Sequence, residues 1–260
     1  MKTKIKIYGD AFFSSGMYSL PDENGEPSGF FMEDEWLEAH AFDEAGKEYI
    51  DLGTGIAVNT FGVADEVWTE AVTRQLGCIQ HTSNLYYSIP CTRLAQILCE
   101  RTGMKKVFFG NSGAEANECA IKVARKYAAE KKGADHYTII TLENSFHGRT
   151  LTTLAATGQD HFHKLFKPLT AGVIHTPAND IEALLKTVEE NKVAGIMFEC
   201  IQGEGGVLNL DAQFIKAIEK IAQENDIIVI VDEVQTGNGR TGKMYSYMHS
   251  CHQIRLLNGE

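Results

Sequence analysis

The longest aliphatic run of the chain is IIVIV at residues 227–231, and Asp232 follows it directly. An unbroken apolar run of this length is typical of a strand that is buried on both faces of a sheet. Just before it, residues 211–225 carry apolar side chains at helical spacing, which predicts an amphipathic helix. These side chains are Phe214, Ile215, Ile218, Ile221 and Ala222. A helix that leads into a buried strand is part of the repeating unit of parallel sheets.

Strands and helices alternate in the preceding residues as well. Further apolar runs predict strands at residues 106–109, 137–142 and 193–198. A long helix is predicted from Ser112 to about Lys131. A shorter helix has four apolar side chains on one face, namely Ile181, Leu184, Leu185 and Val188. This alternation predicts an α/β fold whose mainly parallel sheet is covered by helices on both faces.

The N-terminal residues follow a different pattern. Two short runs between Trp36 and Leu52 flank the turn-forming residues 43–46. This arrangement predicts a β-hairpin.

The predicted strands also indicate where a ligand would bind. Parallel sheets bind ligands beyond the carboxyl ends of their strands. Four polar or glycine-rich segments follow the strands, at residues 111–113, 143–149, 199–204 and 232–237. We therefore expect these segments to lie together on one edge of the sheet.

The composition excludes several classes of protein. The chain has 260 residues, with 24 Lys and Arg against 35 Asp and Glu, and its net charge of −11 disfavours nucleic acid as a partner. No apolar segment is long enough to span a bilayer, and no signal-peptide core follows the N-terminal lysines. The six cysteines include no Cys-x-x-Cys pair, which favours reduced thiols. We expect a cytoplasmic protein that binds neither membrane nor nucleic acid.

A glycine-containing helix start is predicted at residues 110–115. Ser112 is a good N-cap, and Glu115 three residues later completes a capping box, whatever the function. The same helix start also exposes N–H groups at the positive end of the helix dipole, where a phosphate can bind.

Asp232, Phe146 and Arg149 each have a functional and an ordinary explanation. Asp232 is either a helix cap or a solvated loop acid, or it is partly buried and pairs with a cation such as a protonated ring nitrogen, because an unpaired buried charge is costly. Phe146 either packs against the domain or stacks on a planar ring. Arg149 is either a surface charge or a bidentate partner for a substrate carboxylate.

Other motifs could indicate a different ligand or a different class of enzyme. Residues 237–243 fit a dinucleotide glycine pattern and most of a P-loop, but Met244 stands where a P-loop needs Ser or Thr. The histidines within residues 161–163 and 249–252 lack a second ligand cluster, so no metal site is expected. A Gly-x-Ser-x-Gly elbow, which would indicate a serine hydrolase, is absent from the sequence.

Several short stretches between about residues 35 and 248 occur together, in this order, in one enzyme family. They read GTGIAVN at 53–59, HTSNLYY at 81–87, NSGAEANE at 111–118, SFHGRT at 145–150, LAATGQ at 154–159, IQGEGG at 201–206 and DEVQTG at 232–237. In these stretches the chain resembles the class III pyridoxal-phosphate-dependent aminotransferases, most closely the acetylornithine type. The resemblance implies the large domain of the fold-type I transferases, with pyridoxal 5'-phosphate as cofactor.

The resemblance also assigns residues to the cofactor. The phosphate would bind the N–H groups of Gly113 and Ala114 at the helix start that Ser112 caps. Phe146 would stack on the pyridine ring. Asp232 would pair with the protonated ring nitrogen and so keep the ring an electron sink.

Four further residues are assigned in the same way. Gln235 would contact the 3-hydroxyl group of the ring, and Val234 is also expected among the cofactor-binding residues. Arg149 would bind a substrate carboxylate. Glu204 resembles the family's glutamate that pairs with a C-terminal arginine and controls substrate choice.

The resemblance implies transfer of an amino group from N-acetylornithine to 2-oxoglutarate in arginine biosynthesis, by a homodimer. Gly55 and Ile56 fit the acetylornithine type better than relatives with an aromatic residue there. Succinylornithine, ornithine and 4-aminobutyrate remain alternative amino donors.

The chain departs from the family in several places. Cys200 stands where the family commonly has proline, and the residues before about Trp36 match poorly. The family's Schiff-base lysine would fall just past Glu260, and residues 249–260 do not resemble the approach to it. Lys243 lies before that position and is not expected to replace it, so no catalytic residue is assigned within the chain.

These departures imply an incomplete enzyme. We expect residues 1–60 to belong to the small domain and residues 61–260 to an incomplete cofactor-binding domain, without a C-terminal small domain. Such a chain would be an inactive fragment. The alternative is a non-catalytic module that binds the cofactor or pairs with a full-length subunit through residues 77–90.

Overall fold

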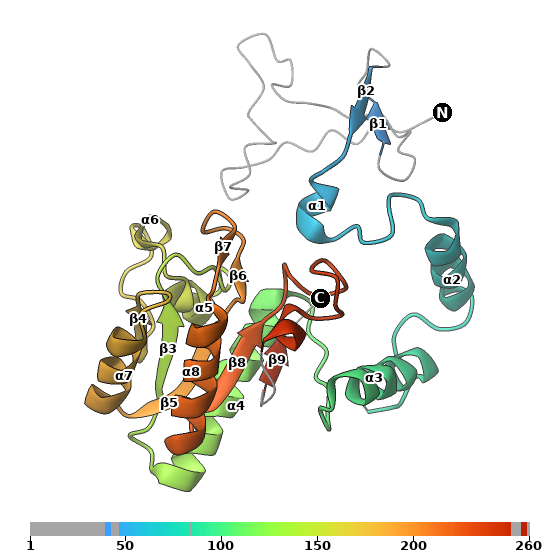
Figure 1. The fold of residues 1–260 in the computed structure, drawn as a ribbon. Helices are drawn as coiled ribbons and strands as arrows, with labels where there is room; N and C mark the ends of the chain where they lie inside the picture. The colour runs from blue at the N-terminus through green and yellow to red at the C-terminus, as the bar shows by residue number, and fades with distance from the viewer. Residues whose placement is uncertain (1–39, 43–46, 84, 251–255, 259–260) are drawn as a thin grey trace. The chain divides into compact units, whose positions relative to one another are not determined.

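The computed structural model describes residues 40–42, 47–83, 85–250 and 256–258 (Figure 1). It divides into two compact units, residues 1–83 and 84–260. The elements of the first unit are β1 (His40–Phe42), β2 (Glu48–Ile50), α1 (Thr54–Ala57) and α2 (Glu66–Leu76). Strands β1 and β2 pair antiparallel, which confirms the predicted hairpin. Its turn residues 43–46 lie outside the described residues.

A five-stranded parallel sheet is the centre of the second unit (Figure 1). Its strands lie in the order β4-β3-β5-β8-β9, and every neighbouring pair is parallel. They are β3 (Thr138–Leu142), β4 (Val173–Thr176), β5 (Val193–Phe198), β8 (Ile228–Asp232) and β9 (Leu256–Asn258). A small antiparallel pair, β6 (Ile201–Gln202) and β7 (Leu208–Asn209), follows β5. The predicted mainly parallel sheet is confirmed, as are its strands β3, β5 and β8.

The helices of the second unit connect these strands. They are α3 (Ile89–Thr102), α4 (Gly113–Lys132), α5 (Leu151–Ala156), α6 (Asp160–His163), α7 (Ile181–Glu190), α8 (Ala212–Glu224) and the 3₁₀ helix η1 (Ser246–His249). Helices α4, α7 and α8 confirm the three helices that the sequence predicts. In α7 only Leu184 and Val188 are buried, whereas Ile181 and Leu185 are exposed, so the contact with the core is narrower than the apolar face.

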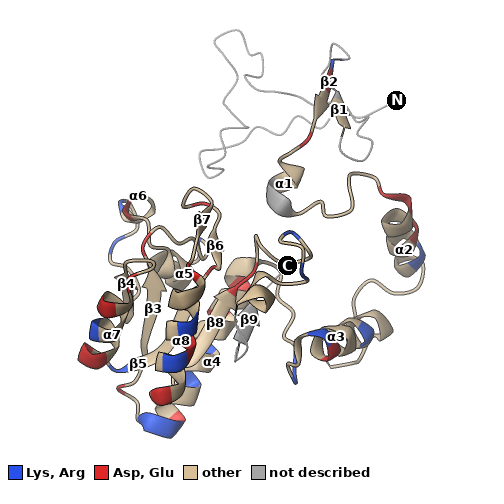
Figure 2. Ribbon diagram, viewed as in Figure 1, with Lys and Arg blue, Asp and Glu red and all other residues tan. Residues whose placement is uncertain are grey.

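The side chains of β8 alternate between two apolar cores, one on each face of the sheet. Ile228 and Ile230 pack in the core that includes α4, while Val229 and Val231 pack in the core that includes α7 and α8. Figure 1 shows α8 in front of the sheet and α4 behind it. In Figure 2 most of the coloured charged residues lie on helices and loops, β3 and β5 carry none, and the acid of β8 is at its carboxyl end. The unbroken apolar runs are therefore explained by burial on both faces.

The strand predicted at residues 106–109 is wrong, because no strand is present there. Residues 106–109 pair with none of the described strands, although β4 and β9, at the two ends of the sheet, each have a single neighbour among them. Phe108 and Phe109 are 62% and 43% exposed, so this short run lacks both the pairing and the burial that stabilise a strand.

Helix α4 begins where the sequence predicts. The Ser112 hydroxyl accepts a hydrogen bond from the Glu115 N–H at 3.2 Å, as an N-cap does. The expected capping box is only partly correct. The Glu115 carboxylate accepts from the N–H of Asn111, at 2.7 Å, instead of that of Ser112. The helix start is therefore tied to the residue before the cap.

Replacing the cap, Ser112→Ala, is expected to lower the free energy of unfolding by about 1 kcal/mol, because one N–H of the first turn loses its acceptor. Urea denaturation followed by circular dichroism measures the change. Ser112→Asp, which retains a capping oxygen, is the matched control and should unfold like the wild type. An alanine variant as stable as the wild type would show that the cap contributes nothing.

The other end of α4 is held by one cation. The Lys132 ammonium donates hydrogen bonds to the carbonyl oxygens of Val193, Asn225 and Asp226, at 3.0, 3.1 and 3.1 Å. These carbonyls lie at the start of β5 and just before β8. Between its two ends, α4 presents small side chains to the sheet, namely Ala120, Ala124 and Ala128. The helix therefore lies close against the strands and is fixed at both ends.

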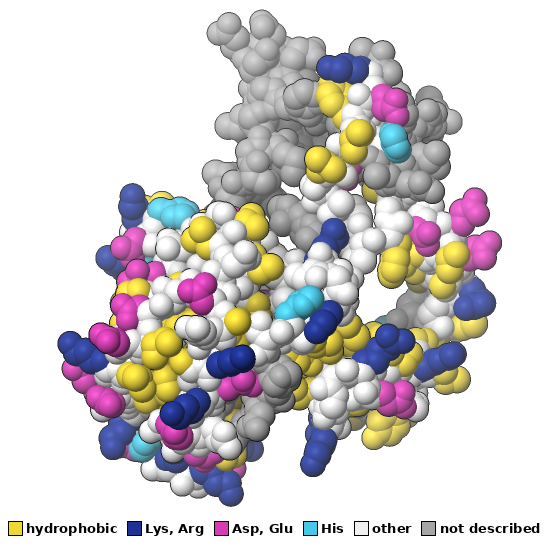
Figure 3. Space-filling view, in the orientation of Figure 1, with side chains coloured by type: hydrophobic (Ala, Val, Ile, Leu, Met, Phe, Trp, Pro, Cys, Tyr) yellow, Lys and Arg dark blue, Asp and Glu magenta, His cyan; other side chains and the backbone are white. Residues whose placement is uncertain are grey.

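Helices α2 and α3 lack any buried residue. Figure 3 shows hydrophobic side chains at the surface of both. Within the described part of the chain, none of the helices combines the length and the apolar character needed to cross a membrane.

Candidate functional site

The strand order places a ligand crevice between β3 and β5. From β3 the chain continues to β4 on one side of it, whereas from β5 it continues to β8 on the other side. Ligands of such sheets bind where the connections diverge, beyond the carboxyl ends of the strands. A hydrogen bond of 3.0 Å crosses this switch point, from the Phe146 N–H after β3 to the Glu199 carboxylate after β5. Three of the four segments expected on the ligand edge follow β3, β5 and β8.

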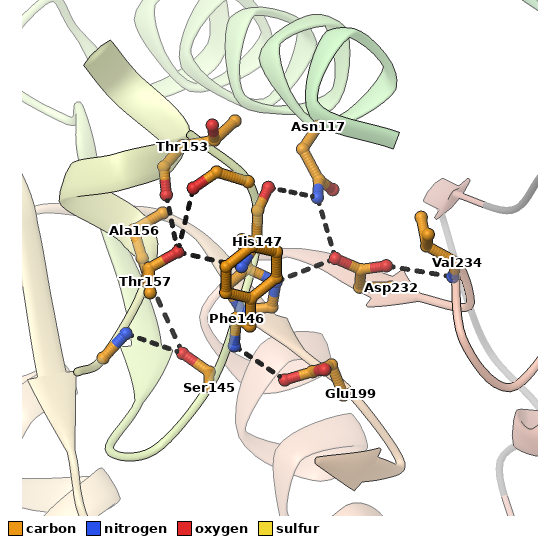
Figure 4. Close-up of polar contacts among 12 residues, drawn as sticks. Asn117, Ser145, Phe146, His147, Thr153, Ala156, Thr157, Glu199, Asp232 and Val234 are labelled. Carbon is orange, nitrogen blue, oxygen red and sulfur yellow. Dashed lines mark hydrogen bonds and ion pairs between the residues drawn. The ribbon is translucent and has the colours of Figure 1, made fainter. Parts of the chain in front are cut away.

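Asp232 is the centre of the polar network on this edge (Figure 4). Its carboxylate is 4% exposed at the end of β8. Oδ2 accepts hydrogen bonds from Asn117 Nδ2 at 2.8 Å and from His147 Nδ1 at 2.9 Å, and Oδ1 accepts from the Val234 N–H at 3.1 Å. Helix α4 and the segments after β3 and β8 therefore converge on one carboxylate, which is held in a fixed orientation.

His147 supplies the charge partner of Asp232. Burial alone would lower the pKa of this imidazole, but the hydrogen bond and charge of Asp232, together with the charge of Glu199, outweigh burial and raise it. The raised pKa favours the protonated imidazole, which forms a buried ion pair with the Asp232 carboxylate 2.9 Å away. His147 Nε2 is buried and has no hydrogen-bond partner among the described residues.

Glu199 is the second buried acid of the network. Burial raises its pKa to about 7, with further increases from the charges of Asp232 and Glu204, while the charge of His147 acts in the opposite direction. An acid with a pKa near 7 is partly protonated at neutral pH, so Glu199 differs from an ordinary exposed glutamate.

Glycines let the start of α4 approach the neighbouring loops. A Cβ atom on Gly113 would lie 2.5 Å from Val234 Cγ2, and one on Gly148 would lie 2.7 Å from the Cβ of Ala114. Gly148 also has a φ of 123°, which residues with a side chain rarely adopt. The Ala114 N–H makes no hydrogen bond within the described part of the chain. The helix start thus offers N–H groups at the positive end of a 20-residue helix, a favourable place for an anion.

Gln235 lies against the turn that follows β6. A Cβ atom on Gly203 would come within 2.1 Å of Gln235 Oε1. Six of the residues predicted to bind a ligand are thus linked through neighbouring residues in one region. They are Gly113, Ala114, Phe146, Asp232, Val234 and Gln235. Ser112 lies beside them at the helix cap and is exposed.

Arg149 lies over two aromatic rings. Its Cζ is 4.9 Å from the centroid of Phe162 and 5.8 Å from that of Phe146, within the range of cation–π attraction. The two rings meet edge to face, with centroids 5.6 Å apart. Arg149 is exposed and forms no ion pair with the described residues, so its guanidinium is available for a carboxylate ligand. Glu204 is exposed in the turn between β6 and β7.

Glu233, next to Asp232, holds the following loop. Its buried carboxylate accepts four hydrogen bonds: Oε1 from Ser246 Oγ and the Tyr247 N–H, both at 2.8 Å, and Oε2 from Thr236 Oγ1 at 2.5 Å and the Ser246 N–H at 2.9 Å. Residues 234–247 therefore form a closed loop whose two ends meet at one side chain.

Four residues of this region, Asn117, His147, Glu199 and Glu233, are not predicted as site residues from the sequence. His147, Glu199 and Glu233 do lie in segments expected on the ligand edge. Glu199 directly follows β5, and Glu233 directly follows β8. Only the position after the strand was a usable signal for them. Asn117 has no such signal, because its contact with Asp232 joins residues 115 positions apart.

Comparison with known proteins gives a consistent result. The family model for aminotransferase class III matches residues 29–254. An acetylornithine aminotransferase of Haemophilus ducreyi is 53% identical over 79% of this chain and 52% of its own length. A succinylornithine transaminase of Salmonella paratyphi A is 43% identical over 80% of this chain and 51% of its own length. The chain spans about half the length of these curated relatives.

A solved structure is similar as well. It is the ornithine aminotransferase from Toxoplasma gondii, described with partial occupancy of pyridoxal phosphate at its active site. It is 29% identical, with a TM-score of 0.83 over 88% of this chain and 55% of that one. The α/β fold is therefore that of an aminotransferase. The family match covers most of the described residues and includes every side chain of the network around Asp232, so the chain belongs to the class III aminotransferases, whose cofactor is pyridoxal phosphate.

Proposed function

We propose that this chain provides the cofactor-binding part of an enzyme that transfers an amino group from N-acetylornithine to 2-oxoglutarate in arginine biosynthesis. The observation that supports it best is the orientation of Asp232, whose buried carboxylate is held by Asn117, His147 and the Val234 N–H. The 53% identity to an acetylornithine aminotransferase supports this donor. Amino acids and 2-oxo acids are then the substrates.

The residues around Asp232 fit pyridoxal phosphate. A buried carboxylate suits the protonated nitrogen of the ring. The start of α4, where glycine allows the close approach of Val234, suits the phosphate through the N–H groups of Gly113 and Ala114. Phe146 would cover a face of the ring, and Gln235 would meet its 3-hydroxyl group. His147 Nε2, buried without a partner among the described residues, leaves a donor next to the same network.

The side chains of this site have separate tasks in the proposed reaction. Pyridoxal phosphate supplies an electron sink for the carbon that bears the amino group. Asp232 keeps the ring nitrogen protonated, and His147 stabilises the charged form of Asp232. Arg149 would bind a substrate carboxylate, and the rings of Phe146 and Phe162 limit the directions in which its guanidinium can point. Glu204, at the exposed turn, would select between substrates.

Other amino donors are the alternative within the same chemistry. Succinylornithine is favoured by the relative that is 43% identical, and ornithine by the similar solved structure. 4-Aminobutyrate is a further alternative donor. Gly55 and Ile56 favour the acetylornithine type.

We also propose the assembly and domain division that the resemblance implies. Residues 1–60 would belong to a small domain and residues 61–260 to the cofactor domain of a homodimer. Tyr86, Tyr87 and Ile89 are 71%, 98% and 84% exposed, and a second subunit that covers them would remove this apolar surface from water. A cytoplasmic location stays a prediction.

A borohydride experiment tests the proposal. The chain is incubated with pyridoxal phosphate, treated with sodium borohydride and denatured, and dialysis then separates bound from free cofactor. We expect saturable binding before reduction, since Asp232 and the α4 start form the site. Reversible binding supports a cofactor-binding part whose lysine is elsewhere, and covalent retention would place the reactive lysine in this chain. A chain without saturable binding would contradict the proposed function.

The amino donor is tested separately. The cofactor-loaded chain is titrated with each of N-acetylornithine, succinylornithine, ornithine and 4-aminobutyrate, and the absorbance change of the bound cofactor gives the affinity for each donor, so that no turnover is needed. Tighter binding of another donor than of N-acetylornithine would contradict the proposed substrate and leave the proposed cofactor site unaffected.

A further inference from the structure

Glu199 has a contact that the proposed function does not use. Its carboxylate accepts the hydrogen bond of the Phe146 N–H at 3.0 Å (Figure 4). The residues on either side of Phe146 bond elsewhere. Ser145 O accepts from the Gly158 N–H, and the His147 N–H donates to Thr157 Oγ1. Phe146 is thus the residue of this segment whose N–H is directed to the end of β5.

We propose that Glu199 is a positioning residue that holds Phe146 against the cofactor ring by accepting its N–H hydrogen bond across the switch point. This inference rests on the proposed function, because it concerns the ring on which Phe146 would stack. The side chain of Phe146 is half-buried and meets Phe162 edge to face. Phe162 therefore supports the ring of Phe146, while Glu199 supports its main chain.

The charges around Glu199 make this support dependent on the ligand. His147 faces Glu199 from the segment after β3, Asp232 from the end of β8, and Glu204 from the turn after β6. An ionised carboxylate is a stronger acceptor than a protonated one. A cation that pairs with Asp232 offsets its negative charge and so favours ionised Glu199. Binding of the cationic ring would then strengthen the bond that holds Phe146.

The Phe146 amide reports on this bond without any ligand. Ser145–Phe146 is the only Ser–Phe pair in the sequence, so labelling with ¹³C-carbonyl serine and ¹⁵N-phenylalanine gives one selected NMR signal. Burial raises the pKa of Glu199 to about 7, so the shift of this amide proton should change with a midpoint near pH 7. Below the midpoint Glu199 is protonated and the bond is weaker. Above the midpoint it is ionised and the proton resonance moves downfield.

Three variants make this titration decisive. Glu199→Gln keeps an acceptor but removes the charge, so the transition should disappear while the signal remains. Glu199→Asp keeps the charge on a side chain that is one methylene shorter, so the pH-dependent change in the amide proton shift should be smaller. Glu224→Gln, at an exposed glutamate of α8, should titrate like the wild type. Two results would refute the inference. One is a wild-type amide proton shift that stays constant from about pH 5 to about pH 9. The other is an unchanged transition in Glu199→Gln, which would assign the transition to His147.

Affinity for pyridoxal phosphate, measured by equilibrium dialysis, tests the positioning role. Glu199→Ala, which removes the acceptor, should weaken binding at least about tenfold, and Glu199→Gln should weaken it less. Circular dichroism checks that both variants fold. A wild-type chain that binds no cofactor overturns the proposed function. Wild-type binding that neither variant changes overturns the role of Glu199 alone.

Discussion

Replacing Asp232 by asparagine is expected to weaken the binding of pyridoxal phosphate by about a hundredfold. The neutral amide cannot pair with a protonated ring nitrogen, and the buried imidazole of His147 loses its counter-charge at the same time. Removing one partner from a buried ion pair typically costs about 3–5 kcal/mol, and each 1.4 kcal/mol corresponds to a factor of about ten in affinity. Equilibrium dialysis of the variant against the wild type measures the loss.

The matched control is Asp211→Asn. Asp211 is exposed at the start of α8 and its carboxylate makes no capping hydrogen bond, so the same chemical change should leave affinity as it is. Asn117 bonds to Oδ2 of Asp232 and the Val234 N–H to Oδ1, so one of these donors faces the amide NH₂ group in the variant. Circular dichroism therefore checks that the Asp232 variant keeps the wild-type fold before its affinity is compared. An Asp232 variant that binds the cofactor as tightly as the wild type would rule out its pairing with the ring nitrogen.

The substitution Glu233→Gln is expected to lower the free energy of unfolding by about 3 kcal/mol. Each oxygen of the Glu233 carboxylate accepts one main-chain N–H, of Ser246 at Oε2 and of Tyr247 at Oε1. Whichever oxygen becomes the amide NH₂ group of glutamine then faces an N–H donor. A lost hydrogen bond to a charged group costs about 1.5–3 kcal/mol, and the opposed donor is left buried without an acceptor.

Urea denaturation of the two proteins measures this difference. Glu224→Gln is again the control, since Glu224 is exposed and its ion pair with Lys220, at 3.9 Å, is worth less than about 1 kcal/mol. If Glu233→Gln is destabilised no more than this control, the closed loop 234–247 does not depend on its carboxylate.

The sequence was informative about the fold because the core follows simple periodicities. The unbroken run at 227–231 predicts β8, and the helical spacing from Phe214 to Ala222 predicts the buried face of α8. It failed at residues 106–109, which pair with none of the described strands. Pairing with a neighbouring strand is a property of the whole sheet and cannot be read from four residues.

The candidate site was predictable to a similar extent. Residues that end a strand, such as Asp232, were identified from their place in the alternation. The helix start that contains Gly113, and Phe146, were candidates from their place alone, and the family resemblance gave them their roles and added Gln235. The contact of Asn117 and the raised pKa of Glu199 were not predictable, because both depend on which loops meet in three dimensions. Asn117 in particular lies on a helix whose start gives no hint of a partner 115 residues later.

The two fixed ends of α4 have a consequence for how this chain can change during evolution. Lys132 ties one end to the carbonyl groups before β5 and β8, while Asn117 bonds to Asp232 near the other. A helix advances by about 1.5 Å and turns by about 100° per residue. A single-codon deletion between these two residues would therefore aim Asn117 away from the carboxylate. Insertions and deletions should be rare in this helix among descendants that keep the cofactor, even though much of its outer surface would tolerate exchange of side chains.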